Sequence, residues 1–253
     1  GKDAVIVSGG ELGVSTSADM KKGFSSDSLV RIEGGSTTIK VTGAAAYDSE
    51  DSDYTGSAGI KADKLFEILG GTLAVSNSGT GGKGISGDGP GYFKGGSVTV
   101  VTTGSNYGSS SGGGSGPGGR PGWGSSSSSS VSAKGIKFDG DLSFSGAATI
   151  SGGYVCAWST GNDGLDANGN CYIKGGLVYA IGAGSPEVAV DANTEARKKL
   201  YVQGGILVAV GGLESGSSLS QKCYSASWSK STWYGLTVGS ETFAFKTPSS
   251  AGN

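Results

Sequence analysis

Four carboxylate residues recur at matching places in two neighbouring segments of the sequence, NDGLDANG and SPEVAVDAN. The two segments are predicted to form adjacent strands, and adjacent strands lie about 4.8 Å apart. Two carboxylates at that separation repel each other unless a cation bridges them or one of them holds a proton. Ca²⁺ prefers a flexible cage of about six to eight oxygen ligands. We therefore expect a calcium site formed by Asp163, Asp166, Glu187 and Asp191.

Lysines at the same positions of the preceding unit offer an alternative to calcium. In an ion-pair ladder, Lys137 would meet Asp166 and Lys134 would meet Asp163. A second and weaker calcium candidate is the acidic loop of residues 44–58, although most such acidic runs are simply solvated. Its carboxylates are Asp48, Glu50, Asp51 and Asp53.

Aromatic residues at one outward position are the candidates for contact with sugars. Tyr172 and Tyr201 fall at the same place in consecutive units, with Tyr92 further back along the same column. A flat aromatic ring suits the apolar C–H face of a sugar, whose hydroxyls need polar partners nearby. The alternative is ordinary cross-strand packing that stabilises the sheet. Trp123, in a Gly/Ser-rich stretch, is the rival candidate for a sugar platform.

A repeated Gly-Gly step indicates the architecture that positions these side chains. The step follows alternating apolar segments such as VRIEGG (30–35), FEILGG (66–71) and CYIKGG (171–176). Each unit reads as three short strands, and alternation places Ile32, Ile68 and Ile173 in one inward column. One such unit cannot bury its own apolar face, whereas stacked units form a continuous core. The sequence predicts an all-β, right-handed parallel β-helix of about six to seven rungs; a β-propeller is the competing fold.

We expect residues 1–253 to form a single β-helix domain with two departures from the repeat. Residues 104–130 are a Gly/Ser-rich insertion, and residues 213–253 are a strand-rich C-terminal tail. The outward positions of the last units are apolar, and a strand that is apolar on both faces is usually covered. The tail, with Trp228, Phe243 and Phe245, is therefore predicted to pack on them. Docking of the tail could bring Cys156 within disulfide distance of Cys223.

Composition excludes several classes of function. The chain has no histidine, which removes Ser-His-Asp and Cys-His catalysis and His-ligated zinc. A net charge of −2 argues against a nucleic-acid partner, which a basic excess would indicate. No apolar run is long enough to span a bilayer, so the chain is not predicted to be transmembrane. Its start at Gly1-Lys2 suggests that an export signal has been removed, which would make the protein secreted or attached to the cell surface.

Several strings resemble a known family. They are KGISGDG (83–89), KGIKFDGDLSFSG (134–146), SGGYVCAWSTGNDGLDANGNCYIKGG (151–176), SPEVAVDANTE (185–195) and GGLESGSSLSQ (211–221). They are similar to the carbohydrate-binding-domain family typified by a clostridial cellulose- and pectin-binding β-helix protein. Secreted or surface proteins of gut Bacteroides often carry such a domain. The resemblance implies a right-handed parallel β-helix similar to that of polysaccharide lyases, bound calcium, and polysaccharide binding without strong evidence of catalysis. Earlier units carry lysine where Asp163 stands, which argues against calcium sites in the first half: Lys22, Lys83 and Lys134.

The sequence leaves three hypotheses for function. The first is an exported, non-catalytic and monomeric protein that binds a cellulose- or pectin-like polysaccharide and is stabilised by calcium. The second is a calcium-dependent polysaccharide lyase, in which Lys137 or Lys174 would be the base that takes the proton next to a uronate carboxyl. Neither lysine has an evident reason for a lowered pKa, so the lyase is the weaker hypothesis. The third is a structural surface spacer.

Overall fold

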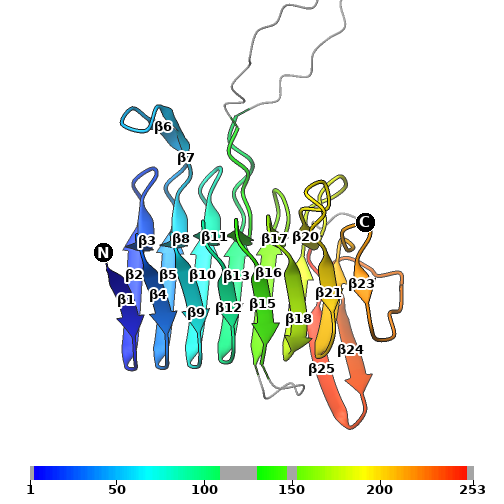
Figure 1. The fold of residues 1–253 in the computed structure, drawn as a ribbon. Coiled ribbons are helices and arrows are strands. Elements are labelled where there is room, and N and C mark those ends of the chain that lie inside the picture. Colours follow the sequence, from blue (N-terminus) through cyan, green and yellow to red (C-terminus); the bar gives the residue numbers. More distant parts are fainter. Residues whose placement is uncertain (1–2, 109–129, 147–152, 250–253) are drawn as a thin grey trace, which may run out of the picture.

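Three long parallel sheets make up most of the molecule (Figure 1). The structure is a computed structural model that describes residues 3–108, 130–146 and 153–249. Within these ranges every regular element is a β-strand and there is no helix, and hence no helix long and apolar enough to cross a membrane. The arrangement is consistent with a β-helix or another solenoid, because successive segments of the chain add one strand to each sheet in turn.

The strands of each sheet follow one another along the long axis in Figure 1. The first sheet has the order β1 (Ala4–Val7), β4 (Leu29–Ile32), β9 (Leu65–Ile68), β12 (Gly91–Phe93), β15 (Leu142–Ser145), β18 (Cys171–Gly175), β21 (Leu200–Val202) and β23 (Ser218–Leu219). The second has the order β2 (Glu11–Thr16), β5 (Ser36–Val41), β10 (Thr72–Asn77), β13 (Ser97–Thr102), β16 (Tyr154–Ser159), β19 (Leu177–Ile181) and β22 (Ile206–Val210). The third has the order β3 (Lys22–Ser26), β8 (Ala58–Ala62), β11 (Lys83–Gly87), β14 (Ile136–Phe138), β17 (Leu165–Ala167) and β20 (Val190–Ala192).

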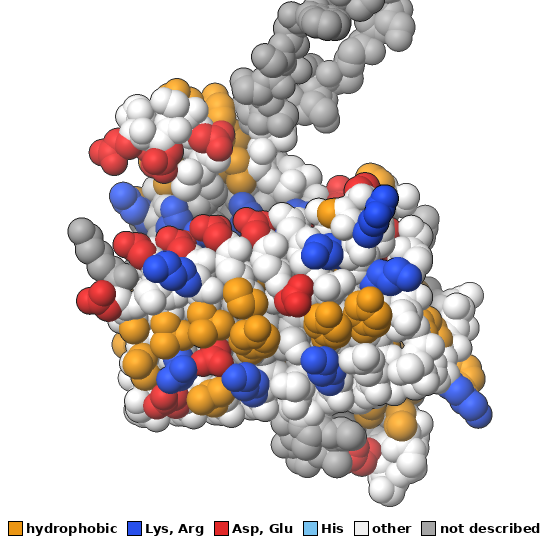
Figure 2. Space-filling model, viewed as in Figure 1, with side chains coloured by type: hydrophobic (Ala, Val, Ile, Leu, Met, Phe, Trp, Pro, Cys, Tyr) orange, Lys and Arg blue, Asp and Glu red, His pale blue; other side chains and the backbone are white. Residues whose placement is uncertain are grey.

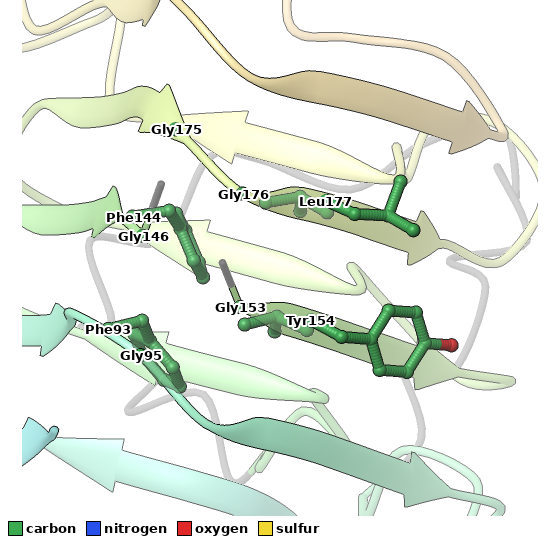
Figure 3. Close-up of a pocket in the computed structure, with 11 residues that line it drawn as sticks. Phe93, Gly95, Phe144, Gly146, Gly153, Tyr154, Gly175, Gly176 and Leu177 are labelled. Carbon is green, nitrogen blue, oxygen red and sulfur yellow. The ribbon is translucent and has the colours of Figure 1, made fainter. Parts of the chain in front are cut away.

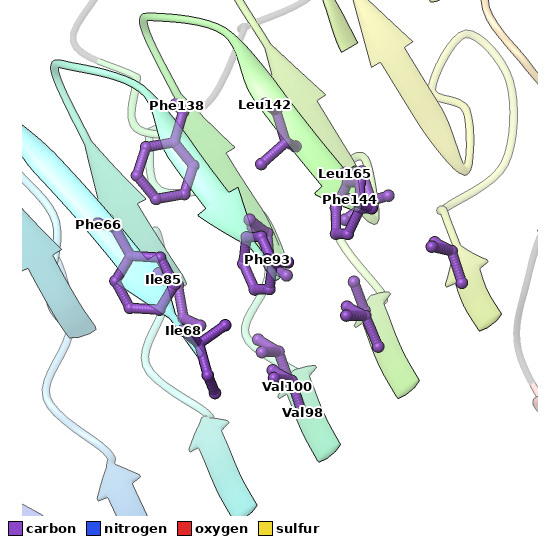
Figure 4. Packing of buried hydrophobic residues seen from close by; sticks show 14 of the residues in the cluster. Phe66, Ile68, Ile85, Phe93, Val98, Val100, Phe138, Leu142, Phe144 and Leu165 are labelled. Atoms are coloured by element: carbon purple, nitrogen blue, oxygen red, sulfur yellow. The ribbon is translucent and has the colours of Figure 1, made fainter. Parts of the chain in front are cut away.

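The core consists of the inward columns that the alternation predicts, and their register is confirmed. Ile32 pairs with Ile68, and Ile68 pairs with Phe93. Strand β5 alternates between exposed and buried residues along its whole length, as a half-buried strand should. The phenylalanines form a continuous column through the interior (Figure 4), with the rings of Phe93 and Phe144 stacked at 4.8 Å between centroids. These columns give the outer faces of the sheets a fixed register.

The Gly-Gly steps form the corners between the first and second sheets. The second glycine of a step has a positive φ, as at Gly35 (77°) and Gly71 (78°), a backbone region that other residues rarely adopt. The corners also stack closely, since a Cβ atom on Gly35 would lie 2.5 Å from the carbonyl oxygen of Gly10. The glycines therefore set both the turn and the spacing of the units.

The unit around residue 145 is irregular, as the sequence suggests. The register between β15 and β18 shifts between Phe144 and Ser145, and residues 147–152 lie outside the described ranges. A small cavity of about 10 Å³ lies at this place, between Phe93, Phe144 and Leu177 (Figure 3). A cavity of this size holds about one water molecule, so it is not a sugar site.

The acidic loop forms a hairpin that projects beside the third sheet (Figure 1). Its strands are β6 (Ala46–Asp48) and β7 (Asp53–Thr55), paired antiparallel. The ring of Tyr54 lies 5.3 Å from that of Tyr47 and 5.6 Å from that of Tyr107, and Tyr107 pairs with Val131 at the base of the insertion. Aromatic contacts therefore hold the hairpin in place.

The C-terminal tail packs on the last strands of the second sheet, which confirms the predicted docking. Its antiparallel strands are β24 (Trp233–Val238) and β25 (Glu241–Lys246). Phe245 lies 5.2 Å from the ring of Tyr179, whose hydroxyl donates a hydrogen bond to the Lys246 carbonyl at 2.8 Å. Cys156 is buried in this contact. The suggested Cys156–Cys223 disulfide is not present, because Cys223 lies exposed in the segment before the hairpin and both thiols are free.

Candidate functional site

The outer face of the third sheet carries most of the candidate residues, and its charge changes sign along the axis. The register places Lys61, Ser86, Lys137, Asp166 and Asp191 in one column, as the sequence predicts. The column is therefore basic in the first half of the sheet and acidic in the second. The two kinds of charge meet between β14 and β17.

The predicted aspartates come together at the acidic end. Carboxylate oxygens of Asp163, Asp166 and Asp191 all lie within 4.8 Å of one another. Asp163 and Asp166 are almost fully buried, and Asp191 is half-buried. Among the described residues, no other group of three or more potential metal ligands lies so close together. The carboxylates of the β6–β7 hairpin therefore do not form a second metal site of this kind.

Both ion pairs of the alternative ladder are also present. The Lys134 ammonium lies 3.0 Å from Asp163 and contacts Asp166 as well. Lys137 lies 3.4 Å from Asp166 and 2.9 Å from Asp139. Burial lowers the pKa of Lys134, but the adjacent Asp166 and Asp163 carboxylates more than offset this and leave its pKa raised. Two lysines thus neutralise part of the acidic cluster.

The remaining carboxylates lie in surroundings that disfavour their charged form. Burial and the nearby Asp163 and Asp166 carboxylates raise the pKa of Asp191 to about 7. Burial and the Asp163 carboxylate also raise the pKa of Glu187. Glu187 thus lies near the cluster, although it is not among the three mutually close aspartates.

Glu214 belongs to this cluster and was not predicted. It forms a hydrogen bond with Asp191, and it accepts hydrogen bonds from the backbone and hydroxyl of Ser215 at 2.8 Å. Val190 forms a parallel bridge with Leu213, so Glu214 continues the outward column of Asp191. The Gly-Leu step at 212–213 is the same marker that precedes Asp166, and it could have located this residue from the sequence.

Tyr172 and Tyr201 form the predicted pair on the first sheet. Their Cα positions are paired across β18 and β21, and the rings are stacked at 5.2 Å with an angle of 10° between planes. The Lys174 ammonium lies 4.6 Å from the centre of the Tyr172 ring. Each ring therefore turns one face to the other, which is the geometry of cross-strand packing and leaves less ring face for a sugar.

The other two aromatic candidates do not join this pair. Tyr92 lies in the same column, but Ser143 separates it from Tyr172. The Lys94 ammonium lies 5.3 Å from the Tyr92 ring and forms an ion pair with Glu67 at 2.6 Å. Trp123 lies outside the described residues.

Lys22 and Lys83 are the cationic residues whose importance the sequence did not reveal. Unlike Lys134, neither forms an ion pair within the described part of the chain. Burial, together with the positive charges of Lys134, Lys137, Lys61 and Lys22, lowers the pKa of Lys83 to about 8. Burial and the Lys61 charge also lower the pKa of Lys22. The signal in the sequence was the recurrence of lysine before three of the Gly-apolar steps (Lys22, Lys83 and Lys134), at a position where a later unit carries Asp163.

Comparison with known proteins agrees with part of the resemblance. Residues 1–106 match a family model described as "Carbohydrate-binding domain-containing protein". No curated protein and no solved structure gives a significant match to the chain.

Proposed function

We propose that the protein is a non-catalytic polysaccharide-binding protein. The observation that carries this proposal is the match of residues 1–106 to a carbohydrate-binding domain family. The fold supports it, because stacked parallel sheets give long and regular outer faces along which an extended chain molecule can lie. In this proposal the sheets form one right-handed parallel β-helix of about six to seven rungs, and the molecule is monomeric and is exported to the cell surface or beyond.

Calcium is part of the proposal, and the acidic cluster is the site where it fits. Asp163, Asp166 and Asp191 supply close oxygen ligands, with Glu187 and Glu214 nearby. Burial, followed by the nearby Asp163 and Asp166 carboxylates, raises the pKa of Asp191, so its charged form is disfavoured unless a cation lies beside it. A further buried oxygen, Oδ1 of Asn162, has no hydrogen-bond partner within the described ranges. Bound Ca²⁺ would supply two positive charges to these oxygens and stabilise the last units.

Exposed aromatic residues are proposed to contact the sugar. The stacked Tyr172–Tyr201 pair, with Tyr92 on the same face, is the candidate among the described residues, and Trp123 is the candidate in the insertion. A stacked pair of tyrosines still offers ring edges and hydroxyl groups to a polysaccharide lying along the sheet.

Retention on a panel of polysaccharides tests the proposal. The protein would be mixed with insoluble cellulose, pectate gel and xylan, with added Ca²⁺ or with EDTA, and the unbound fraction measured. The proposal predicts retention on at least one glycan that free sugar fragments of that glycan compete away. Equal recovery of the protein from every glycan and from an inert matrix would contradict it.

Lys83 provides the observation that favours a lyase as the second candidate. Its pKa of about 8 leaves part of the amine uncharged in mildly alkaline solution, as a general base requires. In a lyase the base takes the proton next to the uronate carboxyl, the glycosidic C–O bond at the β carbon breaks, and its oxygen leaves with a proton. Formation of unsaturated uronide ends is the measurement that separates a lyase from a binding protein.

A further inference from the structure

A cleft lies between the β6–β7 hairpin and the first strands of the third sheet. Its volume is about 260 Å³, and four lysines line it: Lys22, Lys61, Lys83 and Lys137. We call it the lysine cleft. Tyr54 forms part of its wall on the hairpin side. Figure 2 shows Lys and Arg side chains gathered beneath the acidic hairpin. Pockets for drug-sized ligands are usually about 300–1,000 Å³, so the lysine cleft suits roughly one sugar unit of a longer chain.

The lysine cleft holds more positive than negative charge. Among the described residues two carboxylates line it, Asp88 and Asp139, and they pair with Lys61 and with Lys137. Lys22 and Lys83 have no ion-pair partner within the described ranges. The chain as a whole carries a net charge of −2, so this excess is local to the cleft.

Rigid elements hold the unpaired lysines at the cleft. The Asn77 side chain donates a hydrogen bond to the Lys83 carbonyl at 2.9 Å and to the Ser57 hydroxyl at 3.2 Å. A Cβ atom on Gly56 would lie 3.5 Å from the Lys83 ammonium, so the backbone after β7 passes close to this charge. The half-buried Lys83 is thus surrounded by other cations and fixed backbone, an arrangement that costs free energy without a bound anion.

We propose that the lysine cleft binds the anionic group of an acidic sugar, a carboxylate or a sulfate. The inference rests on the proposed function and assigns to the lysine cleft the recognition of the acidic groups of a polysaccharide. Lys83 and Lys22 pair with the anionic group, and Tyr54 contacts the sugar ring. Such a site explains why like charges converge on one cleft of an otherwise slightly acidic protein.

Binding of matched charged and neutral glycans tests this proposal. Polygalacturonate and dextran sulfate carry the two candidate anions, and fully methyl-esterified polygalacturonate and dextran are their neutral counterparts. Calorimetric titration is done in EDTA at pH 7, so that no calcium ion bridges the glycan to the protein. The wild-type protein is expected to bind one or both acidic polymers at least about tenfold more tightly than the neutral counterpart, and the polymer bound identifies the anion.

Substitutions assign the binding to the lysine cleft. Lys83→Met and Lys22→Met each remove one charge from it, whereas Lys40→Met removes one from the exposed face of β5. Each cleft variant is expected to weaken binding about five- to tenfold, and Lys40→Met less than twofold. Melting curves establish whether the variants are folded. If Lys83→Met does not fold, Lys22→Met alone tests the lysine cleft.

Four results would overturn the proposal. Equal loss of affinity in Lys40→Met and in the cleft variants would show a general charge effect, and unchanged affinity in both cleft variants would place the anion elsewhere. Binding of neutral polymers as tight as that of acidic ones would refute the acidic substrate class while leaving polysaccharide binding intact. If no glycan binds, here or in the retention panel, the proposed function fails together with this inference.

Discussion

Lys83 and Asp191 lie on the same sheet face, and each is half-buried near charges of its own sign. Burial and four neighbouring lysines lower the pKa of Lys83 to about 8, whereas burial and nearby carboxylates raise the pKa of Asp191 to about 7. Each group is thus less stable in its charged form than it would be in water. A ligand of opposite charge would stabilise the charged form of each group. That ligand is an anion at Lys83 and a cation at Asp191.

The lowered pKa of Lys83 predicts a dependence of stability on pH. The folded protein releases this proton near pH 8, whereas the unfolded chain keeps it to about pH 10.5. Between these values the unfolded state binds more protons, so the contribution of Lys83 to stability increases as pH rises, by at most about 1.4 kcal/mol per pH unit. Denaturant unfolding is measured from pH 7 to 10. The free energy of unfolding is expected to include this rise in the wild type, and Lys83→Met is expected to lack it.

Other lysines and tyrosines titrate in the same range, so the comparison must be made between variants. Lys40→Met is the matched control, since it removes an exposed lysine and should leave the pH profile of the wild type unchanged. Superimposable profiles of Lys83→Met and the wild type would show that Lys83 is not held near other cations.

If calcium binds at the acidic cluster, removal of calcium by a chelator should lower the melting temperature. An ion that binds only the folded state stabilises it by mass action. EDTA is therefore expected to lower the melting temperature by several degrees relative to Ca²⁺ in excess. The double variant Asp166→Asn, Asp191→Asn should lose this difference. Equal melting of the wild type in EDTA and in Ca²⁺ would argue that Lys134 and Lys137 alone complete the cluster.

At the scale of the strands, most of the architecture could be predicted. Period-two alternation and the Gly-Gly steps gave the three sheets and the register of their columns, because stacked units repeat the same physical constraint. The lysine cleft could not be predicted in the same way. Its wall is a hairpin inserted between two repeats, and its placement depends on the contacts of Tyr54 with Tyr107, residues separated by more than one unit. Periodicity carries no information about such insertions.

The stacked tyrosines yield a prediction that separates sugar binding from sheet packing. Tyr172→Ala combined with Tyr201→Ala should weaken retention on an insoluble glycan several-fold, since each aromatic contact is worth on the order of 1 kcal/mol. Loss of their mutual contact should cost no more than about 1 kcal/mol of stability. Tyr224→Ala, at a residue that is 81% exposed in the tail, is the control. Normal retention by the double variant would mean that the pair only packs the sheet.

The docked C-terminal hairpin is expected to contribute directly to stability. Phe245 packs against Tyr179 and Tyr234 at 5.2 and 5.8 Å between ring centroids. Because Phe245 is only half-buried, Phe245→Ala should lower the free energy of unfolding by about 1–3 kcal/mol, below the range of about 3–5 kcal/mol for fully buried rings. Hydrogen exchange in β19 and β22 should become faster. Trp233→Ala, at a 67% exposed residue of the same hairpin, should change neither quantity, and equal effects of the two variants would contradict specific docking.

At the scale of the whole molecule, charge of the two signs is partly separated along the third sheet. Lysines line the half that contains β3, β8 and β11, and carboxylates gather on the half that contains β17 and β20. The two halves meet in the Lys134 and Lys137 ion pairs, which neutralise charge there and leave unpaired lysines in the lysine cleft. An acidic polymer would bind at one half only, and added salt should weaken this binding by screening.

The whole molecule is expected to bind such a polymer without cleaving it. At pH 7 Lys83 is mostly protonated, and the described residues near it include no histidine that could protonate the leaving oxygen. Polygalacturonate incubated with the protein at pH 7, with or without Ca²⁺, should therefore gain no ultraviolet absorbance from unsaturated uronides. The same incubation at pH 9 is the sharper test, since Lys83 is then largely uncharged. Absorbance that grows at pH 9 in the wild type and in Lys40→Met, but not in Lys83→Met, would establish the lyase instead.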